Sequence, residues 1–368
     1  MKQLFMVLIL FLISLGYISE VKAQGEAAVT YLLLAPDSRA AGIGESGAGL
    51  ADNSAAIFWN PGGIAFQSGS EIGLTHANWL PQFGLDLSYD YLTFRTYVES
   101  IGGSITASLT YMNYGEFQRT GSSGPEVIGT FRSYDLAATI GYATKLGEDW
   151  GLGFNFRLIH SNLSDQPTEN EVGTGVATTV SFDVGGMWRP KDILNGNFSI
   201  GANLSNVGPK IAYIDQDQAD PLPTNLRFGL AYRIFQDGYN SLTATFDASK
   251  LLVSRKDSNV DKDTVIVQPN EFRSIEYAMG VEYWYGPPED FKFAVRGGYF
   301  YEDPEFGNRN FLTFGAGIRY DIYGFDFSYI STTGSEAENH PLDGTLRFSL
   351  IIEWGLAETT PMGLPRGI

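Results

Sequence analysis

The chain has 368 residues and no cysteine, and its 24 Lys and Arg residues against 42 Asp and Glu residues give a net charge of −18. The absence of cysteine excludes disulfide scaffolds, cysteine-ligated metal centres and thiol catalysis, and the acidic charge argues against binding to nucleic-acid phosphates. Glycine (43 residues) and aromatic side chains (14%) are both abundant, a combination that favours many strands and turns over helices.

The first 23 residues have the pattern of a secretory signal peptide. Lys2 supplies a positive charge, residues 4–15 form a short apolar core, and Val21-Lys22-Ala23 is a small-x-small cleavage site. An uncleaved anchor is the alternative, but the apolar run is short for a membrane-spanning helix. We therefore expect export and a mature chain that begins at Gln24, which cannot carry a thiol-linked lipid.

Residues 24–69 are too rich in glycine and alanine to cross lipid as a strand. A short helix is expected to be capped within Asp52-Asn53-Ser54, to run through Trp59, and to stop at Asn60-Pro61. Small residues allow a backbone to approach a neighbouring wall closely. We therefore predict that this segment forms a compact plug in or under a barrel.

From residue 70 to residue 354, apolar residues alternate with small or polar ones in segments of about ten residues. In the last segment, Leu346, Phe348 and Leu350 alternate with Arg347 and Ser349. A period of two places each set on one face of a β-strand. We predict fourteen strands, at residues 70–78, 85–96, 102–112, 134–145, 150–162, 177–189, 196–207, 225–235, 240–252, 274–285, 291–301, 310–320, 323–331 and 344–354.

The connections between these segments alternate between short and long. Residues 146–149 and 321–322 are tight turns, whereas residues 113–133, 208–224 and 253–273 are long loops. Outer-membrane barrels have an even number of such strands, short periplasmic turns and long external loops. The predicted fold is therefore all-β: a fourteen-stranded antiparallel transmembrane β-barrel at residues 70–354, followed by a periplasmic tail at residues 355–368.

A soluble exported all-β protein is the competing interpretation. Its strands would be about half as long as these, and its second face would not be rich in Gly, Ser, Thr and charged residues. The apolar face also ends repeatedly in aromatic residues, as the girdles of membrane barrels do: Tyr89, Tyr142, Tyr232, Tyr283, Tyr320 and Trp354.

The alternation places the charged side chains of the strands on the face opposite the apolar one, which is the lumen face. An arginine on the lipid face would cost about 2–4 kcal/mol at mid-depth. Their expected partners are carboxylates of the same face, such as Asp135, Asp183, Asp247, Glu282 and Asp326. The side chains assigned to the lumen are Arg157, Arg227, Arg233, Arg296, Arg319, Arg347 and Glu353.

The long loops are acidic. One interpretation is a solvated crown that aids solubility; the other is a surface that binds a basic partner or divalent cations. The candidate partner-binding residues in these loops include Asp165, Glu169, Asp215, Asp217 and Glu336.

No set of residues points to an enzyme. His76, His160 and His340 are not spaced as metal ligands, and no nucleophile and orienting group accompany His160 as a base. Gly42-Ile43-Gly44-Glu45-Ser46-Gly47 has the spelling of a dinucleotide site, but the βαβ context that this motif needs is missing. We expect no catalytic residue, no cofactor and no metal.

Two stretches resemble a known family. Residues 35–44 and 59–63 resemble the amino-terminal signature of PorV-type outer-membrane proteins of the type IX secretion system, which are related to the FadL family of fourteen-stranded barrels. Residues 111–116 are similar to a further family segment. The residues that carry the signature are Pro36, Asp37, Arg39, Gly42, Gly44, Trp59, Asn60 and Pro61. Two features depart from the family pattern: Gly62, where relatives often have Ala, and the tail at residues 355–368. They leave open that the chain is a PorQ-like sister of the family.

The resemblance implies protein export without catalysis. A PorV-type protein binds secreted cargo that bears a C-terminal signal, takes it from the large translocon barrel and passes it to a sortase-containing attachment complex. By this resemblance the barrel is plugged, lies in outer-membrane lipid and uses its long loops as contact surfaces. A FadL-like transporter of hydrophobic small molecules is the alternative.

Overall fold

The computed structural model of the protein describes residues 27–120, 126–164, 174–214, 219–253, 271–287, 291–304, 306–333 and 340–355. The expected signal peptide, the expected tail beyond Gly355 and the five acidic loop residues named above lie outside these ranges. None of the helices within them is long and apolar enough to cross a membrane.

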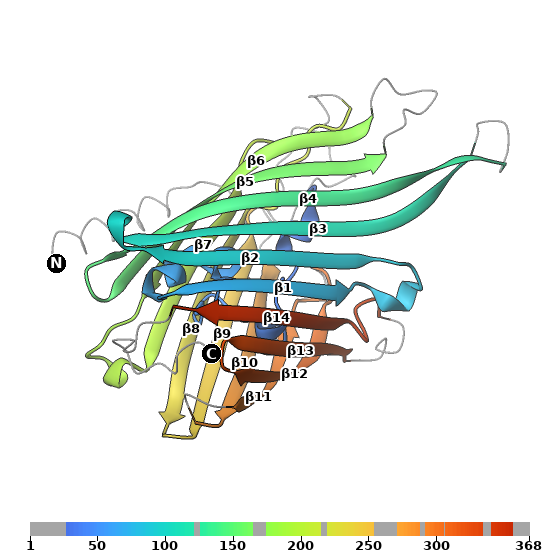
Figure 1. Ribbon diagram of the computed structural model, residues 1–368. Coiled ribbons are helices and arrows are strands. Elements are labelled where there is room, and N and C mark those ends of the chain that lie inside the picture. The colour runs from blue at the N-terminus through green and yellow to red at the C-terminus, as the bar shows by residue number, and fades with distance from the viewer. Residues whose placement is uncertain are drawn as a thin grey trace.

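Within these ranges, fourteen antiparallel strands form one closed sheet in which β1 pairs with β14 (Figure 1). Every other pair joins strands that are consecutive in the sequence, so the barrel is a meander. This confirms the predicted fold, and apart from β3 and β4 the strand ends agree with the prediction within three residues. The strands are β1 (Ser70–Asn78), β2 (Ser88–Val98), β3 (Gly103–Thr120), β4 (Val127–Leu146), β5 (Trp150–Ser164), β6 (Gly175–Trp188), β7 (Phe198–Val207), β8 (Asn225–Gln236), β9 (Asn240–Leu251), β10 (Ile275–Tyr285), β11 (Lys292–Tyr301), β12 (Asn310–Tyr320), β13 (Tyr323–Thr332) and β14 (Leu346–Trp354).

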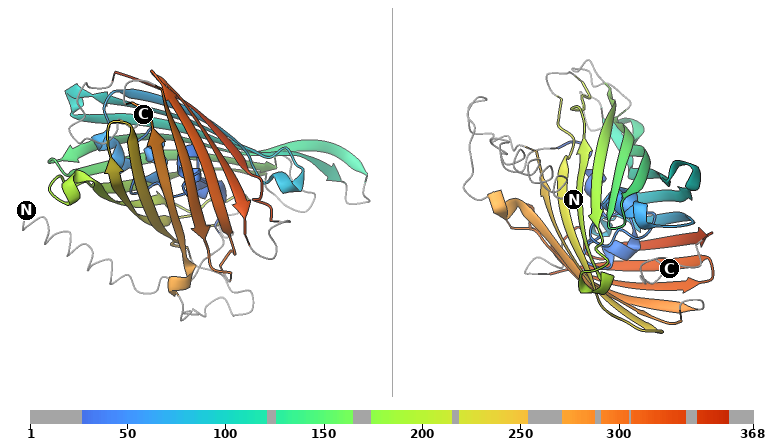
Figure 2. Two further views of the ribbon diagram at one scale, coloured as in Figure 1. Left: turned by 90° about the horizontal axis from the view of Figure 1, so that it is seen from below. Right: turned by 90° about the vertical axis from the view of Figure 1, so that its left-hand side faces the viewer.

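The prediction of a loop at residues 113–133 is wrong, because β3 and β4 continue through most of this range as a paired hairpin. Pairing of β3 with β2 stops at Asn113, and β4 pairs with β5 only from Tyr134 onward. Beyond these points β3 and β4 pair with each other, after a register shift next to Gly115, whose φ is +87°. The shift interrupts the period of two, which hides the strands in the sequence. Figures 1 and 2 show this β3–β4 arm (residues 116–120 and 127–132) projecting from the barrel rim.

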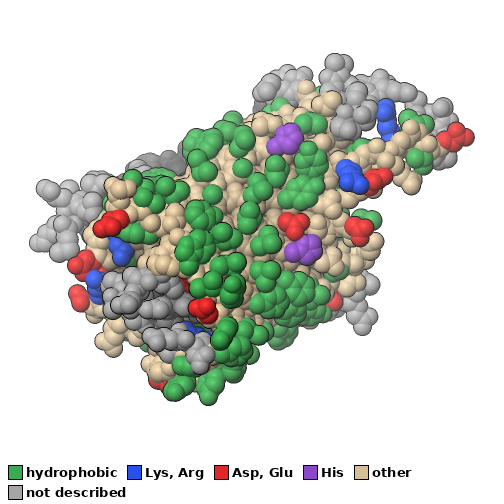
Figure 3. All heavy atoms as spheres, in the orientation of Figure 1, with side chains coloured by type: hydrophobic (Ala, Val, Ile, Leu, Met, Phe, Trp, Pro, Cys, Tyr) green, Lys and Arg blue, Asp and Glu red, His purple; other side chains and the backbone are tan. Residues whose placement is uncertain are grey.

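On the face of the barrel that Figure 3 shows, apolar side chains gather over the outer wall. Leu74, Leu92 and Leu109 form one such row across β1, β2 and β3, and each is more than 40% exposed. The next outward-facing row toward the long-loop end is polar on β1 and β2. There His76 Nδ1 and Asp90 Oδ1 lie 2.7 Å apart. Apolar contact with acyl chains therefore ends near this level on β1 and β2.

Tyr89 does not belong to an outer aromatic girdle, contrary to the prediction. It is 2% exposed, points into the lumen and stacks with Tyr91 at a centroid distance of 6.5 Å. Both faces of β2 carry large side chains, because Leu92 and Phe94 lie on the opposite face. Alternation alone therefore could not assign the inner face. The inner tyrosines pack in one cluster with Tyr31 of the N-terminal segment.

Residues 27–67, which we call the lumen segment, lie inside the barrel (Figure 2). The segment starts at the long-loop end, where Ala28 N donates to the carbonyl of Pro221 (3.1 Å), and leaves at the short-turn end, where the Gly69 carbonyl accepts from Tyr97 N. Its helices are η1 (Thr30–Leu33), α2 (Ser38–Ala41), α3 (Ala56–Trp59) and η2 (Pro61–Phe66). The other short helices of the described ranges lie in connections: η3 (Pro81–Phe83), η4 (Glu99–Ile101), η5 (Leu194–Gly196) and η7 (Glu271–Ser274).

The predicted side-chain cap of α3 is wrong, although its predicted end is right. The N-cap is Ala55, which makes no side-chain hydrogen bond. Asp52 instead pairs with Arg39, and the Ser54 hydroxyl lies 2.7 Å from that of Thr93 on β2. These contacts, one within the lumen segment and one to the wall, occupy side chains that would otherwise cap the helix. The helix ends at Asn60, whose side chain caps η2.

Candidate functional site

The two halves of the family signature meet inside the lumen at Asp37 and Trp59. Asp37 caps α2 by accepting a hydrogen bond from Ala40 N (3.1 Å), and its other carboxylate oxygen accepts from Trp59 Nε1 (2.6 Å). Burial raises the pKa of the Asp37 carboxyl, while these two hydrogen bonds act in the opposite direction. Pro36, directly before this cap, is buried as well.

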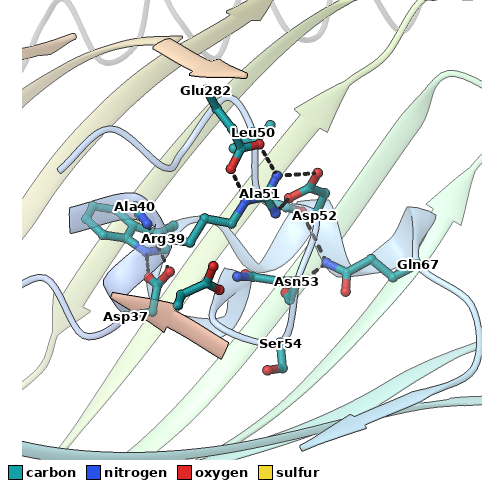
Figure 4. A network of polar contacts seen from close by, with 12 residues as sticks. Asp37, Arg39, Ala40, Leu50, Ala51, Asp52, Asn53, Ser54, Gln67 and Glu282 are labelled. Atoms are coloured by element: carbon teal, nitrogen blue, oxygen red, sulfur yellow. Dashed lines mark hydrogen bonds and ion pairs between the residues drawn. The ribbon is translucent and has the colours of Figure 1, made fainter. Parts of the chain in front are cut away.

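Arg39 connects the lumen segment to the wall (Figure 4). Its guanidinium forms two hydrogen bonds of 2.7 Å to Glu282 on β10 and one of 2.7 Å to Asp52. Burial alone would lower the pKa of Arg39, but the two carboxylates outweigh it and raise the pKa. Arg39 therefore remains a cation that is held between two acids.

The ion pairs continue from Glu282 around the inner wall. Glu282 also pairs with Arg296 on β11 (2.7 Å), Arg296 with Asp326 on β13 (2.8 Å), and Asp326 with Arg319 on β12 (2.5 Å). Three arginines and three carboxylates thus alternate from Asp52 to Arg319, and each interior carboxylate contacts two guanidinium groups. Buried charges are tolerated when they are paired and hydrogen-bonded in this way. The network fixes the lumen segment against β10–β13.

Two further carboxylates of the wall hold backbone amides of the segment. Asp247 on β9 accepts from the amides of Gly47 and Ala48, both at 2.9 Å. Glu71 on β1 accepts from Ser54 N (2.8 Å) and pairs with Arg95 (3.1 Å). Because the amides of an irregular buried segment need partners, these acids replace the hydrogen bonds that a helix would have provided.

Glycine allows the segment to lie directly on the wall. Gly44 has a φ of +76°, and a Cβ there would lie 2.5 Å from the carbonyl oxygen of Met279. A Cβ on Gly42 would lie 3.1 Å from Gly315 Cα. On the other side of the lumen, a Cβ on Gly185 of β6 would lie 2.5 Å from Pro61 Cδ. The wall and the segment therefore approach each other where both lack bulky side chains.

Asn60 is fully buried and links three backbone groups. Its side-chain nitrogen donates to the carbonyls of Ala48 (3.1 Å) and Gly186 (2.9 Å), and its side-chain oxygen accepts from Gly62 N (3.0 Å). All eight signature residues thus lie within the lumen segment, where they make its internal contacts or its contacts to the wall.

The structure places the seven charged residues assigned to the lumen on the inner face, all of them buried. Besides the network above, Arg157 pairs with Asp183 (2.7 Å) and Arg227 with Asp247 (3.6 Å). Arg347 pairs with Glu45 (3.3 Å), Glu353 pairs with Arg95 (2.6 Å), and Arg233 donates to Gln236 (2.5 Å).

Sequence reasoning missed the partners that the lumen segment itself supplies. Arg39 and Glu45 pair with strand residues far away in the sequence, which no local pattern reveals, and Asp52 pairs with Arg39 itself. Arg95 could have been found, because it lies in phase with Thr93 and Tyr91 on the inner face of β2. Asp135, an expected partner of an arginine, instead accepts a hydrogen bond from the Tyr114 hydroxyl (2.7 Å).

The histidines lie away from the lumen network. His76 and His160 are on the outer face, where His160 Nδ1 is 2.9 Å from the Thr178 hydroxyl. His340 lies in the connection before β14 and accepts a hydrogen bond from Leu342 N (3.2 Å). Among the described residues, no group of three or more His, Asp or Glu side chains could hold a metal ion.

A family model described as "Type IX secretion system protein PorV" matches residues 20–258, which is well over half of the chain and includes the whole signature. The chain belongs to the PorV family. This confirms the resemblance drawn from residues 35–44 and 59–63. No curated protein sequence matches the chain.

The PorV-family barrel is also similar in fold to solved channel structures. The CymD monoaromatic hydrocarbon channel is 11% identical, with a TM-score of 0.51, over 86% of this chain and 96% of that one. A TodX deletion mutant is 12% identical, with a TM-score of 0.51, over 86% and 97%. A Pseudomonas aeruginosa FadL homologue is 12% identical, with a TM-score of 0.47, over 87% and 98%. The chain is thus an outer-membrane protein of the PorV family, and its barrel has a fold similar to that of CymD and TodX.

Proposed function

We propose that this PorV-family barrel is a non-enzymatic carrier in type IX secretion. It binds cargo that bears a C-terminal secretion signal, takes it from the translocon barrel and passes it to the sortase-containing attachment complex. The observation that carries the proposal is the family match over residues 20–258, which includes the signature residues packed in the lumen.

The filling of the lumen supports a carrier that handles cargo outside its own barrel. The lumen segment reaches from the Pro221 carbonyl at the long-loop end to Gly69 at the short-turn end. A cavity between the segment and β7–β10 has a volume of about 40 Å³, which is room for roughly three water molecules. A polypeptide does not fit there. In this proposal, residues 24–69 are a permanent plug and residues 70–354 are the membrane barrel.

The β3–β4 arm supports contact with a protein partner at the long-loop end. It stands beyond the strands that flank it, so the outer edges of residues 116–120 and 127–132 have no neighbouring strand among the described residues. Its side chains include Phe117, Val127 and Ile128, each more than 40% exposed. Free strand edges and exposed apolar side chains outside the membrane are typical of protein-binding surfaces.

Deletion and complementation test the proposal. In cells that lack the protein, cargo with a C-terminal signal should accumulate in the periplasm, and the wild-type chain should restore surface delivery. A chain in which residues 116–132 are replaced by a tight turn should assemble in the outer membrane and fail to restore delivery. The doubly substituted F117S/I128S chain is the finer variant. Normal surface delivery in the complete deletion contradicts the carrier role.

Transport of hydrophobic small molecules is the second candidate, because the fold is similar to that of CymD and TodX, whose descriptions name monoaromatic hydrocarbons. It requires the lumen segment to move out of the way. Uptake of toluene by whole cells separates the candidates: a transporter deletion loses uptake and keeps secretion, whereas a carrier deletion does the reverse.

A further inference from the structure

One cavity of about 40 Å³ lies inside the barrel between the lumen segment and the short-turn ends of β7–β10. Its lining combines Leu50, Phe198 and Trp284 with the polar side chains of Arg189, Arg233 and Ser241. The two acids that also line it, Asp52 and Glu282, are already bound by Arg39. The cavity is therefore partly apolar, and its remaining charged groups, the guanidinium groups of Arg189 and Arg233, are hydrogen-bond donors.

Arg189, in the turn after β6, is a buried cation without a carboxylate of its own. It is 5% exposed, and no carboxylate in the described part of the chain forms an ion pair with it. One of its nitrogens donates to the Leu50 carbonyl (2.6 Å), and its guanidinium lies 5.1 Å from the centre of the Phe66 ring. Burial lowers the pKa of Arg189, and Asp52 only partly offsets this. An unpaired buried charge is costly, so this position lacks a counter-ion.

Two donors at the cavity have no acceptor within the described residues. They are Arg189 Nε and the hydroxyl of Ser241, which is itself 5% exposed. Buried donors in native proteins are nearly always paired. A guanidinium presents its N–H groups in a planar fork that matches the two oxygens of a carboxylate. The volume of roughly three water molecules suits a carboxylate with one or two carbon atoms.

We propose that this cavity is a binding site for a small carboxylate anion. The two oxygens accept from the Arg189 guanidinium and the Ser241 hydroxyl, and the carbon end lies against Phe198 and Trp284. The bound anion neutralises Arg189, so that the short-turn end of the plug is complete only when the site is occupied. The inference concerns the lumen and does not depend on the role in secretion.

Saturation-transfer NMR with acetate, on the full-length protein in detergent micelles at constant ionic strength, tests the site. Acetate should bind saturably to the wild type and to Lys191→Gln, whose side chain lies two residues from Arg189 but pairs with Glu148 at the surface. Arg189→Met should lose affinity by at least about tenfold, because it removes a charge-assisted hydrogen bond together with the cation that the anion neutralises. Arg189→Lys keeps the charge without the fork and should lie between the two.

The same samples provide the opposing outcomes. Absence of saturable acetate binding, or equal binding by folded Arg189→Met and wild type, overturns the proposal. Inorganic phosphate is the second probe, and phosphate that competes as well as acetate itself overturns the assignment to a carboxylate. Should Arg189→Met fail to fold, the comparison of Arg189→Lys with Ser241→Ala decides, since both must weaken acetate binding.

Discussion

Trp59 Nε1 donates a hydrogen bond of 2.6 Å to a carboxylate oxygen of Asp37, 22 positions earlier in the chain. This contact closes the lumen segment on itself, because Asp37 begins α2 and Trp59 ends α3. The Trp59 ring also lies 5.0 Å from the guanidinium of Arg227 on β8. One aromatic side chain thus joins both halves of the family signature to the barrel wall.

Replacing Trp59 by Phe should destabilise the protein by about 1–3 kcal/mol. Phenylalanine keeps one aromatic ring at this position but fills less space and lacks the indole N–H. A buried carboxylate oxygen of Asp37 therefore loses its donor, and an unsatisfied buried group costs this much. Urea unfolding in lipid vesicles, followed by circular dichroism, measures the change. Trp150→Phe is the control, since Trp150 lies on the outer face and keeps its ring contact with Trp188. An equal effect of both substitutions contradicts the role of the hydrogen bond.

Gly185→Ala and Gly186→Ala should differ strongly although the two residues are neighbours on β6. A Cβ at Gly185 would lie 2.4 Å from Asn60 Oδ1 and 2.5 Å from Pro61 Cδ, whereas a Cβ at Gly186 would meet nothing within 4 Å. Overpacking typically costs about 1–3 kcal/mol, and an unobstructed substitution changes stability by about 0.5 kcal/mol or less. The same unfolding measurement applies. Equal stability of the two variants means that the lumen segment is not packed against β6.

The barrel was predictable from the sequence because its cause is local. A strand between lipid and lumen must alternate, and Leu346, Phe348 and Leu350 show this without any knowledge of their neighbours. The contacts of the lumen segment were not predictable, because they are long-range: Arg39 binds Glu282, which lies 243 positions later in the chain. The β3–β4 arm was missed because the register shift next to Gly115 interrupts the alternation and because side chains on both faces of the arm are exposed. The prediction for Tyr89 failed for a different reason: both faces of β2 carry large apolar or aromatic side chains, so alternation does not show which face is inside.

Glu282→Gln should cost about 3–5 kcal/mol, the range seen when one member of a buried ion pair is removed. The amide cannot neutralise Arg39 and Arg296, and its NH₂ group would face a guanidinium N–H. The matched control is Glu116→Gln in the β3–β4 arm, where the pair with Arg132 is 3.7 Å long and exposed. That variant should lose less than about 1 kcal/mol. A small loss in Glu282→Gln, comparable to that of the control, is the result that argues against the network.

A disulfide between Ser38→Cys and Ser349→Cys should lock the lumen segment to β14. The two hydroxyl oxygens are 2.9 Å apart, so replacement sulfurs need only a small movement to reach bonding distance, and the natural chain has no cysteine that could interfere. If the segment is a permanent plug, the oxidised double variant should deliver cargo to the surface as well as the single variant Ser349→Cys does. A transporter that must displace the segment would lose toluene uptake on oxidation and regain it on reduction. Loss of cargo delivery only in the oxidised form, reversed by a reductant, would mean that the segment moves during secretion.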